Sequence, residues 1–224
     1  MVRDTFMGNP MDEAFAFIQN NRGTPLGGST GARRFDTEQG SFVGKRGAHP
    51  QHILNEFDMN QYLNELGVPV PEAQLRNIQG QPTMLTRFEE DALPMNVSRD
   101  RQQLTQDFVP HATISNWDML GMNNDNALRR PTGELSYVDV GGAGPFRAQG
   151  APKGSAFGTS VGELDTLREK NPRALGHITE QDLGRSFDIY GGEDAMTQAL
   201  NAIRNPDTRN IMQQRIQDVA QRVA

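Results

Sequence analysis

The chain has 224 residues and a formal net charge of −6, which argues against a nucleic-acid binder that works by neutralising phosphates. It contains no cysteine, and this excludes a disulfide framework, a thiolate metal site and a thiol nucleophile. The length is enough to bury a core in one sizeable domain or in two small lobes.

Residues 1–23 are predicted to form an N-terminal extension with a short amphipathic segment. The first residues, MVRDTFMGNPMDEAF, lack the apolar stretch of a secretory signal, and no run in the chain approaches a membrane span. We therefore predict a cytoplasmic protein, in the cytoplasm of a host cell if the chain is delivered as an effector. The side chains available for packing in the extension are Phe6, Met7, Phe15, Phe17 and Ile18.

Residues 24–47 read TPLGGSTGARRFDTEQGSFVGKRG and predict two strands around a turn at 37–40. Lys45 stands near the end of the second strand. A glycine-rich bend precedes the first strand, where the backbone could come close to phosphate oxygens and donate N–H groups to them. A flexible surface turn and a solvated lysine are the alternative interpretation. The residues of the bend are Gly27, Gly28, Ser29, Thr30 and Gly31.

Residues 50–67, PQHILNEFDMNQYLNELG, predict a helix that carries two acidic candidates, Glu56 and Glu65. Pro50 suits the first turn of this helix and Gly67 its end. His49 and His52 have a spacing that metal ligands can have, but no third ligand is near them in the sequence. We predict that both histidines lie at the surface.

Residues 68–88 contain two short strand-like runs, VPV and PTMLTRF, and lead into three acids at 89–91. Residues 98–115 predict a helix in which Pro110 breaks the apolar period, so that a bend or two separate helices are expected. His111 is predicted to be a core or capping residue. Trp117 is predicted to pack against the loop that follows it.

Residues 116–142 read NWDMLGMNNDNALRRPTGELSYVDVGG and organise the rest of the chain. The Pro-Thr-Gly-Glu turn joins two short strands, so that Asn126 and Asp139 return to the same end of a hairpin. That geometry suits a bound cation. A turn-rich connector would have a similar composition of Asn, Asp and Gly, but here the residues follow a particular order.

In that order the chain resembles the protein-kinase-like superfamily, with NWDMLGMNNDNAL in place of the catalytic loop and VDVGG in place of the DFG segment. VGK around Lys45 resembles the VAIK pattern, whereas GGSTGARRF departs from GxGxxG. NEF followed by LGVPVPE resembles a pattern of HipA-like and actin-fragmin-like kinases. The likeness is to compact, atypical members: the actin-fragmin kinase type, small bacterial effector kinases and, more distantly, HipA and phosphoinositide kinases.

The resemblance implies roles for the residues that match the motifs. Lys45 would contact the phosphates of ATP and be held by Glu56, with Glu65 as the competing partner. Residues 27–31 would cover the nucleotide, and Asp118 would position the acceptor hydroxyl.

A magnesium ion would be held by Asn126 and Asp139 in the same resemblance. Asn123 is the alternative to Asn126, because kinases commonly place this asparagine five residues after the catalytic aspartate. The apolar pair after Asn126 and the spacing of the hairpin favour Asn126.

The fold that the resemblance implies is α+β and bilobal. Residues 24–91 would form a small β-rich N-lobe that ends in a hinge, and residues 92–224 a reduced, mostly helical C-lobe. The glycine-rich stretch after Asp139 would be an activation segment, although no APE motif follows it. Its candidate phosphorylation sites are Ser155, Thr159 and Ser160.

The predicted function is that of an ATP- and Mg²⁺-dependent kinase that phosphorylates Ser or Thr of a protein. The predicted partners include neither nucleic acid nor a membrane span, and the sequence does not indicate an oligomeric state. Three alternatives keep the same fold: a pseudokinase that acts as a structural interaction protein, an AMP transferase, and a small-molecule or lipid kinase.

Overall fold

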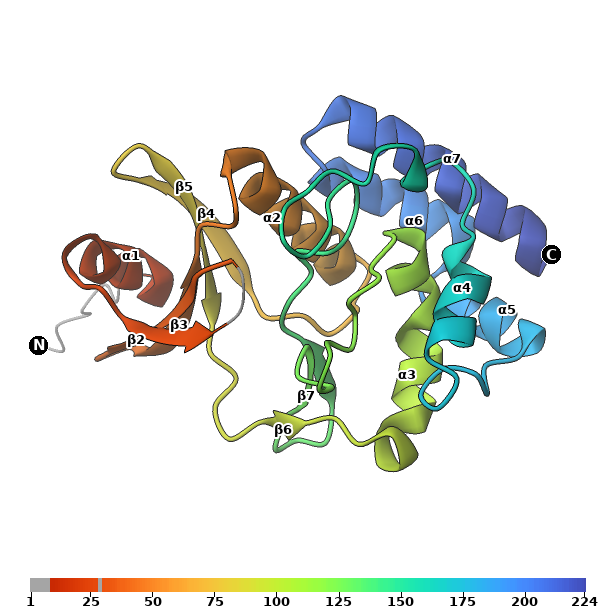
Figure 1. Ribbon diagram of the computed structural model, residues 1–224, viewed down its shortest axis with the longest axis horizontal. Coiled ribbons are helices and arrows are strands. Elements are labelled where there is room, and N and C mark those ends of the chain that lie inside the picture. The colour runs from red at the N-terminus through yellow and green to blue at the C-terminus, as the bar shows by residue number, and fades with distance from the viewer. Residues whose placement is uncertain (1–8, 28–29) are drawn as a thin grey trace, which may run out of the picture.

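Two antiparallel sheets and a set of helices make up the part of the chain that the computed structural model describes, residues 9–27 and 30–224 (Figure 1). The larger sheet has the strand order β1-β2-β3-β5-β4 and the smaller one the order β6-β7-β8. The strands are β1 (Thr24–Gly27), β2 (Ala32–Thr37), β3 (Gly40–Lys45), β4 (Ala73–Ile78), β5 (Gln81–Arg87), β6 (Leu93–Pro94), β7 (Ala127–Arg129) and β8 (Leu135–Tyr137).

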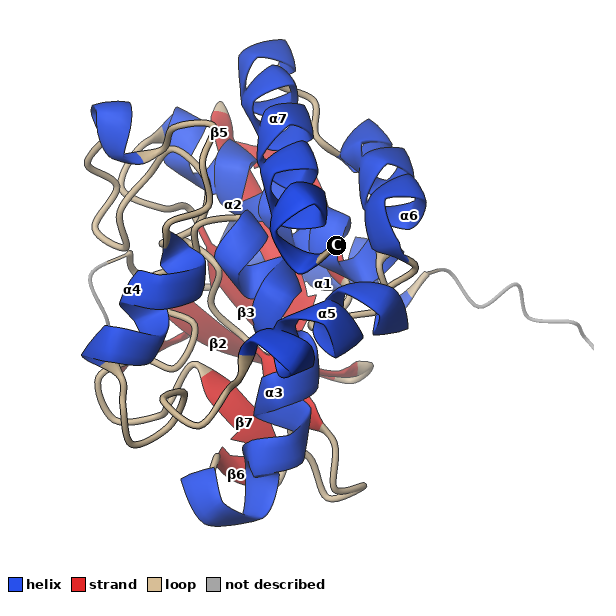
Figure 2. Cartoon of the chain, turned by 90° about the vertical axis from the view of Figure 1, so that its right-hand side faces the viewer, coloured by secondary structure: helices blue, strands red, loops and turns tan. Residues whose placement is uncertain are grey.

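One helix precedes the larger sheet in the sequence, one lies between its third and fourth strands, and the other helices follow it. In Figure 2 the helices of the C-terminal half lie in front and the strands of the larger sheet behind. The α-helices are α1 (Pro10–Asn20), α2 (Pro50–Glu65), α3 (Val97–Thr113), α4 (Glu163–Lys170), α5 (Glu180–Ile189), α6 (Gly192–Ala199) and α7 (Pro206–Val223), and the short 3-10 helices are η1 (Gly154–Ala156) and η2 (Leu200–Ala202). Within the described residues, no helix is long and apolar enough to cross a membrane.

The larger sheet is covered by a helix on each face. Neighbouring residues of a strand point to opposite faces of the sheet, so each residue faces one helix or the other. Gly44 of β3 lies opposite Leu85 of β5, and Lys45 lies opposite Met84. Leu85 belongs to the apolar cluster under α1, whereas Met84 packs against Ile53 of α2. This register turns the Lys45 side chain to the α2 face.

The helix α1 packs on the sheet as expected of an amphipathic segment. Asn9 caps it by accepting a hydrogen bond from the backbone of Met11 (3.0 Å), and Pro10 occupies the first turn. Met11, Phe15 and Ile18 are buried. The expectation for Phe17 is wrong, because its side chain is 38% exposed on the outer side of the helix. Phe6 and Met7 lie outside the described residues.

The helix α2 connects the sheet to the helical half. Ile53 packs on the sheet, while Met59 and Leu63 belong to the main core of the helical half. The prediction that His52 lies at the surface is wrong: the side chain is fully buried, and its Nε2 lies 2.8 Å from the carbonyl oxygen of Gly141. His49 is half-buried and caps the N-terminus of α2.

The helix α3 runs through Pro110 as a single helix, so that of the two expected alternatives, a bend or two separate helices, the second is wrong. A proline inside a helix leaves the carbonyl four residues earlier without its usual N–H donor. Here that carbonyl belongs to Gln106, and it accepts a hydrogen bond of 2.6 Å from the hydroxyl of Ser186 on α5. The same hydroxyl accepts a bond from the backbone N–H of Val109 (3.1 Å). Packing against α5 therefore supplies the bond that Pro110 removes.

Candidate active site

The first element of the site is an ion pair between β3 and α2. Lys45 Nζ donates a hydrogen bond to Glu56 Oε1 at 2.8 Å. Both residues are buried, with 5% and 1% of their surface exposed. Glu65, the competing candidate, is exposed at the end of α2. The sheet register aims Lys45 at α2, and Glu56 lies on the face of that helix which receives it.

Asp139 completes a triad with this pair. Lys45 Nζ lies 3.6 Å from Asp139 Oδ1 and donates to the carbonyl oxygen of Val138 at 3.2 Å. Burial alone lowers the pKa of Lys45, but the negative charges of Asp139 and Glu56 outweigh it, so that the pKa is raised above its usual value. The pKa of Glu56 is raised by burial, which the charge of Lys45 only partly offsets. Lys45 is therefore a permanently charged group.

The hairpin of β7 and β8 brings Asn126 and Asp139 to the same end, as the spacing predicts. Ala127 pairs with Tyr137 across the hairpin, and the carbonyl oxygen of Asn126 accepts a hydrogen bond of 2.9 Å from the backbone N–H of Val138. Asn126 and Asp139 both line one cavity. The alternative residue, Asn123, is exposed and does not line this cavity.

Asp118 is tied to the same site through the backbone. The side-chain amide of Asn126 donates to the Asp118 carbonyl oxygen at 2.7 Å. Burial raises the pKa of the Asp118 carboxyl, and the negative charge of Asp139 raises it further. A carboxylate with a raised pKa is a better proton acceptor than an ordinary surface aspartate.

The cavity has a volume of about 280 Å³ and lies between the larger sheet and the β7–β8 hairpin. Charged and amide groups share its wall with apolar side chains. The lining residues that the later argument uses are Gly27, Val43, Lys45, Phe88, Glu89, Asn126, Leu128 and Asp139.

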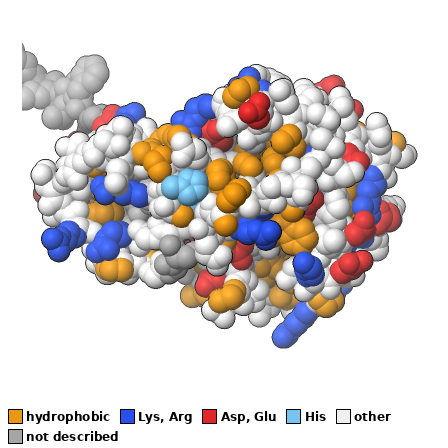
Figure 3. Space-filling view, turned by 45° about the horizontal axis from the view of Figure 1, so that its top comes forward, with side chains coloured by type: hydrophobic (Ala, Val, Ile, Leu, Met, Phe, Trp, Pro, Cys, Tyr) orange, Lys and Arg blue, Asp and Glu red, His pale blue; other side chains and the backbone are white. Residues whose placement is uncertain are grey.

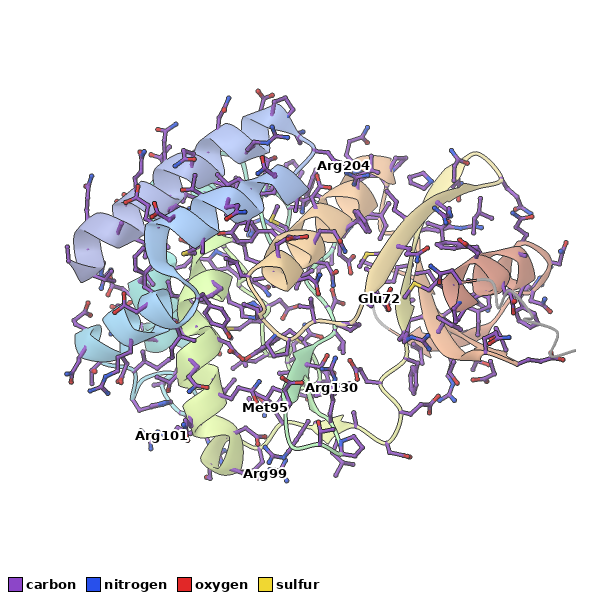
Figure 4. The ribbon with its side chains drawn as sticks, turned by 180° about the vertical axis from the view of Figure 1, so that it is seen from behind. Glu72, Met95, Arg99, Arg101, Arg130 and Arg204 are labelled. Atoms are coloured by element: carbon purple, nitrogen blue, oxygen red, sulfur yellow. The ribbon has the colours of Figure 1, made fainter. Side chains whose placement is uncertain are left out.

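The segment after β5 is fixed to the hairpin by Glu89. Arg130 of the hairpin, labelled in Figure 4, donates two hydrogen bonds to the Glu89 carboxylate at 2.7 and 2.9 Å. Although burial opposes it, these bonds and one from Ser136 lower the pKa of Glu89. The sequence predicted a hinge at the end of residues 24–91 but did not single out Glu89.

The glycine-rich bend is only partly assembled around this cavity. Gly27 lines it and has a φ of +86°, a conformation that glycine adopts readily. Gly28 and Ser29 lie outside the described residues. Thr30 and Gly31 line a different hollow, between the end of α1 and the outer face of the sheet.

Two glycines after Asp139 allow close packing of the triad. A Cβ on Gly141 would lie 3.0 Å from Glu56 Oε2 and 3.2 Å from Asp139 Oδ1. A Cβ on Gly142 would lie 3.2 Å from the Cβ of Asp118. The backbone N–H of Gly141 also donates to Asp139 Oδ1 at 2.9 Å and orients that carboxylate. A side chain at Gly141 or Gly142 would therefore require neighbouring atoms of the site to shift by a few tenths of an ångström.

Two side chains on one face of α2 hold this segment, and sequence reasoning missed both of them. His52 contacts the carbonyl of Gly141, and Asn55 donates to the carbonyl of Ala143 at 3.0 Å. Together with Glu56 they follow the i, i+3, i+4 spacing of a single helix face. Polar residues at this spacing on a helix with buried neighbours were the signal that could have found them.

The donor set fits a magnesium ion bound together with a nucleotide. Asn126 uses its amide nitrogen on Asp118, which leaves its side-chain oxygen as an acceptor, and Asp139 is 37% exposed to the cavity. Glu56, Asp118 and Asp139 carry three formal negative charges against the single positive charge of Lys45. Mg²⁺ is usually held by one or two protein oxygens together with substrate phosphates. Among residues 9–27 and 30–224, no three His, Asp or Glu side chains form a metal cage by themselves.

A larger hollow of about 600 Å³ lies elsewhere and shares no lining residue with the cavity at Lys45 and Asp139. It is formed by α2, the start of α7 and the segment after Asp139, and its apolar wall includes Leu54, Phe146 and Ile211. Figure 3 looks at this side of the molecule and shows apolar side chains across the middle of it. With no carboxylate–lysine triad, this hollow is not the candidate for chemistry.

The fold is kinase-like. Among solved structures, the chain is similar to the crystal structure of a Helicobacter pylori proinflammatory kinase, CtkA, with a TM-score of 0.56 and 10% sequence identity over 91% of this chain and 94% of that chain. No protein-family model matches the chain, and no curated protein matches its sequence. The predicted mixed α and β class and the kinase-like fold are thereby confirmed, whereas the subgroup of kinases stays a prediction.

Proposed function

We propose that this chain is a kinase that transfers the γ-phosphoryl group of ATP to a hydroxyl, on Ser or Thr of a protein. One observation carries the proposal: Lys45 Nζ stands between Glu56, at 2.8 Å, and Asp139, at 3.6 Å, at the end of a cavity that Asn126 also lines. This combination of a fixed ammonium, an amide oxygen and a carboxylate matches what phosphoryl transfer needs. The kinase-like fold supports the same activity.

The reaction exchanges one P–O bond for another. The bond between the γ-phosphorus and the bridging oxygen breaks, a bond from the acceptor hydroxyl oxygen forms, and ADP leaves. Asp118 would orient the hydroxyl and take its proton, because its raised pKa suits a proton acceptor. Lys45 would hold the phosphates in line. Asn126 and Asp139 would hold Mg²⁺, which neutralises charge on the phosphates.

We further propose a bilobal organisation around this cavity, with residues 24–91 as the smaller lobe, residues 92–224 as the larger lobe and residues 1–23 as an extension. The ion pair of Glu89 with Arg130 supports a hinge near residue 89, because it ties the end of β5 to the hairpin. Phe88 lines the cavity beside it and would form part of the adenine wall together with Val43. Met84 does not line this cavity, because its side chain packs against α2.

The test is the intact mass of the purified protein after incubation with Mg-ATP, alone and with a lysate of candidate acceptors. We expect mass to increase in steps of one phosphoryl group, on the protein or on an acceptor, and we expect Lys45→Ala and Asp139→Ala to abolish the increase. An increase by AMP would instead assign nucleotidyl transfer. Stabilisation against heat by Mg-ATP without transfer to protein, lipid or small molecules would assign a binding-only pseudokinase.

A further inference from the structure

A hollow of about 530 Å³ opens beside the segment that joins Asp118 to Asn126. Three stretches form its wall: residues 95–98 at the start of α3, residues 120–122 with Asn124, and residues 170–174 after α4. Arg101 completes it and projects from the first turns of α3 (Figure 4). We call this hollow the basic cavity. Its position next to Asp118 is where an acceptor would approach.

The side chains that line the basic cavity carry a net positive charge, whereas the chain as a whole is negatively charged. It contains Arg101, Lys170 and Arg173 and no Asp or Glu, although the whole chain has a net charge of −6. All three cations are exposed, and in the described part of the chain none of them lies within ion-pair distance of a carboxylate. In contrast, neighbouring arginines such as Arg99 and Arg168 are paired with acids. The unpaired charges are available to a ligand.

Two side chains near the catalytic segment add to this pattern. The ammonium of Lys170 lies 4.6 Å from the ring centroid of Trp117, which holds it by a cation–π contact one residue before Asp118. Met122 is 95% exposed and lines the cavity, so it offers an apolar contact beside the cations. A flexible methionine on an open surface suits contact with varied side chains.

We propose that the basic cavity binds the acceptor protein and selects segments that carry acidic side chains next to the receiving hydroxyl. This inference rests on the proposed kinase function and names its substrate class. A membrane surface is a poorer match, because the cations line a concave site rather than a flat face. Charge complementarity at such a site increases both the rate of association and specificity.

The experiment compares two synthetic peptides of equal length with the same central serine, one flanked by Asp, Glu and a leucine and the other by Gln, Ser and the same leucine. Phosphoryl transfer is measured for the wild type and for Arg101→Glu/Arg173→Glu. The matched control is Arg22→Glu/Arg46→Glu, which has the same change of net charge at two exposed positions beside the larger sheet. Binding of both peptides labelled with fluorescein is measured by anisotropy, which does not need turnover.

We expect the wild type to use the acidic peptide with a kcat/KM about tenfold above the neutral one, through KM, and we expect added salt to reduce the difference. Arg101→Glu/Arg173→Glu should lose about tenfold on the acidic peptide and little on the neutral one, while the control keeps the preference. Equal use of both peptides, an equal loss on both, or variant-sensitive binding to vesicles of anionic lipid without peptide preference would overturn the proposal.

Failure of the kinase function would look different. If neither peptide is phosphorylated and the protein itself gains no phosphate, but anisotropy still shows acidic-peptide binding that Arg101→Glu/Arg173→Glu removes, the proposed function is wrong and the binding surface stands. If transfer occurs without any charge preference, the proposed function stands and the assignment of the basic cavity is wrong.

Discussion

The side-chain amide of Asn126 donates a hydrogen bond of 2.7 Å to the backbone carbonyl of Asp118. This bond joins the two ends of the segment from Asp118 to Asn126 and fixes the amide plane of Asn126. Because Nδ2 is the donor, Oδ1 remains free to bind a cation. The bond thus links the residue proposed to hold metal with the residue proposed to orient the acceptor.

Asn126→Ala is expected to reduce kcat and to raise the magnesium concentration needed for half-maximal activity by about tenfold to a hundredfold. The substitution removes both the oxygen ligand and the bond to Asp118. The measurement is the initial rate of phosphoryl transfer across a magnesium titration at saturating ATP. Asn123→Ala is the matched control, because Asn123 is exposed and lies outside the cavity. A normal magnesium dependence in Asn126→Ala, with a defect in Asn123→Ala, would reverse the assignment.

Glu56→Gln is expected to raise the KM for ATP and to lower kcat/KM by about tenfold to a hundredfold. The change removes the charge that holds Lys45 against α2 and leaves Asp139 as its only nearby counter-charge. Stability should change by only about 1 kcal/mol, because Glu56 Oε2 is already buried without a hydrogen-bond partner. Steady-state kinetics and urea unfolding measure the two effects separately.

Glu65→Gln on the same helix serves as the control for that substitution. Glu65 is exposed and nine residues further along α2, so its loss should change neither kinetics nor stability appreciably. A large effect of Glu65→Gln on KM, with none from Glu56→Gln, would mean that α2 moves so as to exchange the two glutamates.

The parts of the site that sequence predicted are those whose geometry is local. The turn between β7 and β8 fixes the approach of Asn126 to Asp139, since strand pairing and side-chain alternation determine which residues meet. The strand that ends at Lys45 could be predicted from the local sequence, without knowledge of how the strands are ordered in the sheet. The kinase resemblance indicated Glu56, with Glu65 as the alternative, and Glu56 lies on the side of α2 that also buries Ile53.

The parts that sequence missed depend on partners far along the chain. His52 was predicted at the surface because its acceptor, the carbonyl of Gly141, is 89 residues away. Pro110 was predicted to bend a helix or to divide it in two, because its compensating donor, Ser186, belongs to α5. Every residue has a backbone carbonyl, so a sequence pattern does not show which carbonyl accepts a hydrogen bond. These contacts could therefore be found only in the folded structure.

Asp107 predicts a pH dependence of stability in the helical half. This carboxylate is buried and accepts hydrogen bonds from the hydroxyls of Tyr137, at 2.9 Å, and Tyr190. Burial raises its pKa to about 6, although the two tyrosine hydrogen bonds act in the opposite direction. Since the pKa is higher in the folded state, its contribution to stability is present at low pH and is lost as the pH rises through about 6.

Asp107→Asn is expected to remove that dependence. Relative to the variant, the wild type should lose about 3 kcal/mol of unfolding free energy between roughly pH 4 and pH 7. Urea unfolding at a series of pH values, followed by the fluorescence of Trp117, measures the difference. Asp188→Asn on α5 controls for the loss of one carboxylate, because Asp188 is exposed. Parallel pH profiles for the wild type and Asp107→Asn would contradict the prediction.

Arg215 of α7 is fully buried and donates to Glu163 Oε2 at 2.8 Å. Its remaining N–H groups bond the carbonyl oxygens of Thr113, at the end of α3, and of Gly158 and Ser160, before α4. One side chain thus joins three segments that are distant in the sequence. The segment after Asp139 is thereby fixed to the helical core at its far end.

Arg215→Met is expected to lower the unfolding free energy by about 3–5 kcal/mol, because it leaves the Glu163 carboxylate and several carbonyl oxygens buried without donors. Arg222→Met on the same helix is the matched control: its ion pairs with Asp165 and Glu180 are solvent-exposed, and such pairs contribute about 0–1 kcal/mol. Urea unfolding of both variants measures the contrast. Equal losses of unfolding free energy in the two variants would contradict the prediction. They would mean that the hydrogen bonds and ion pair of Arg215 contribute no more to stability than a surface ion pair.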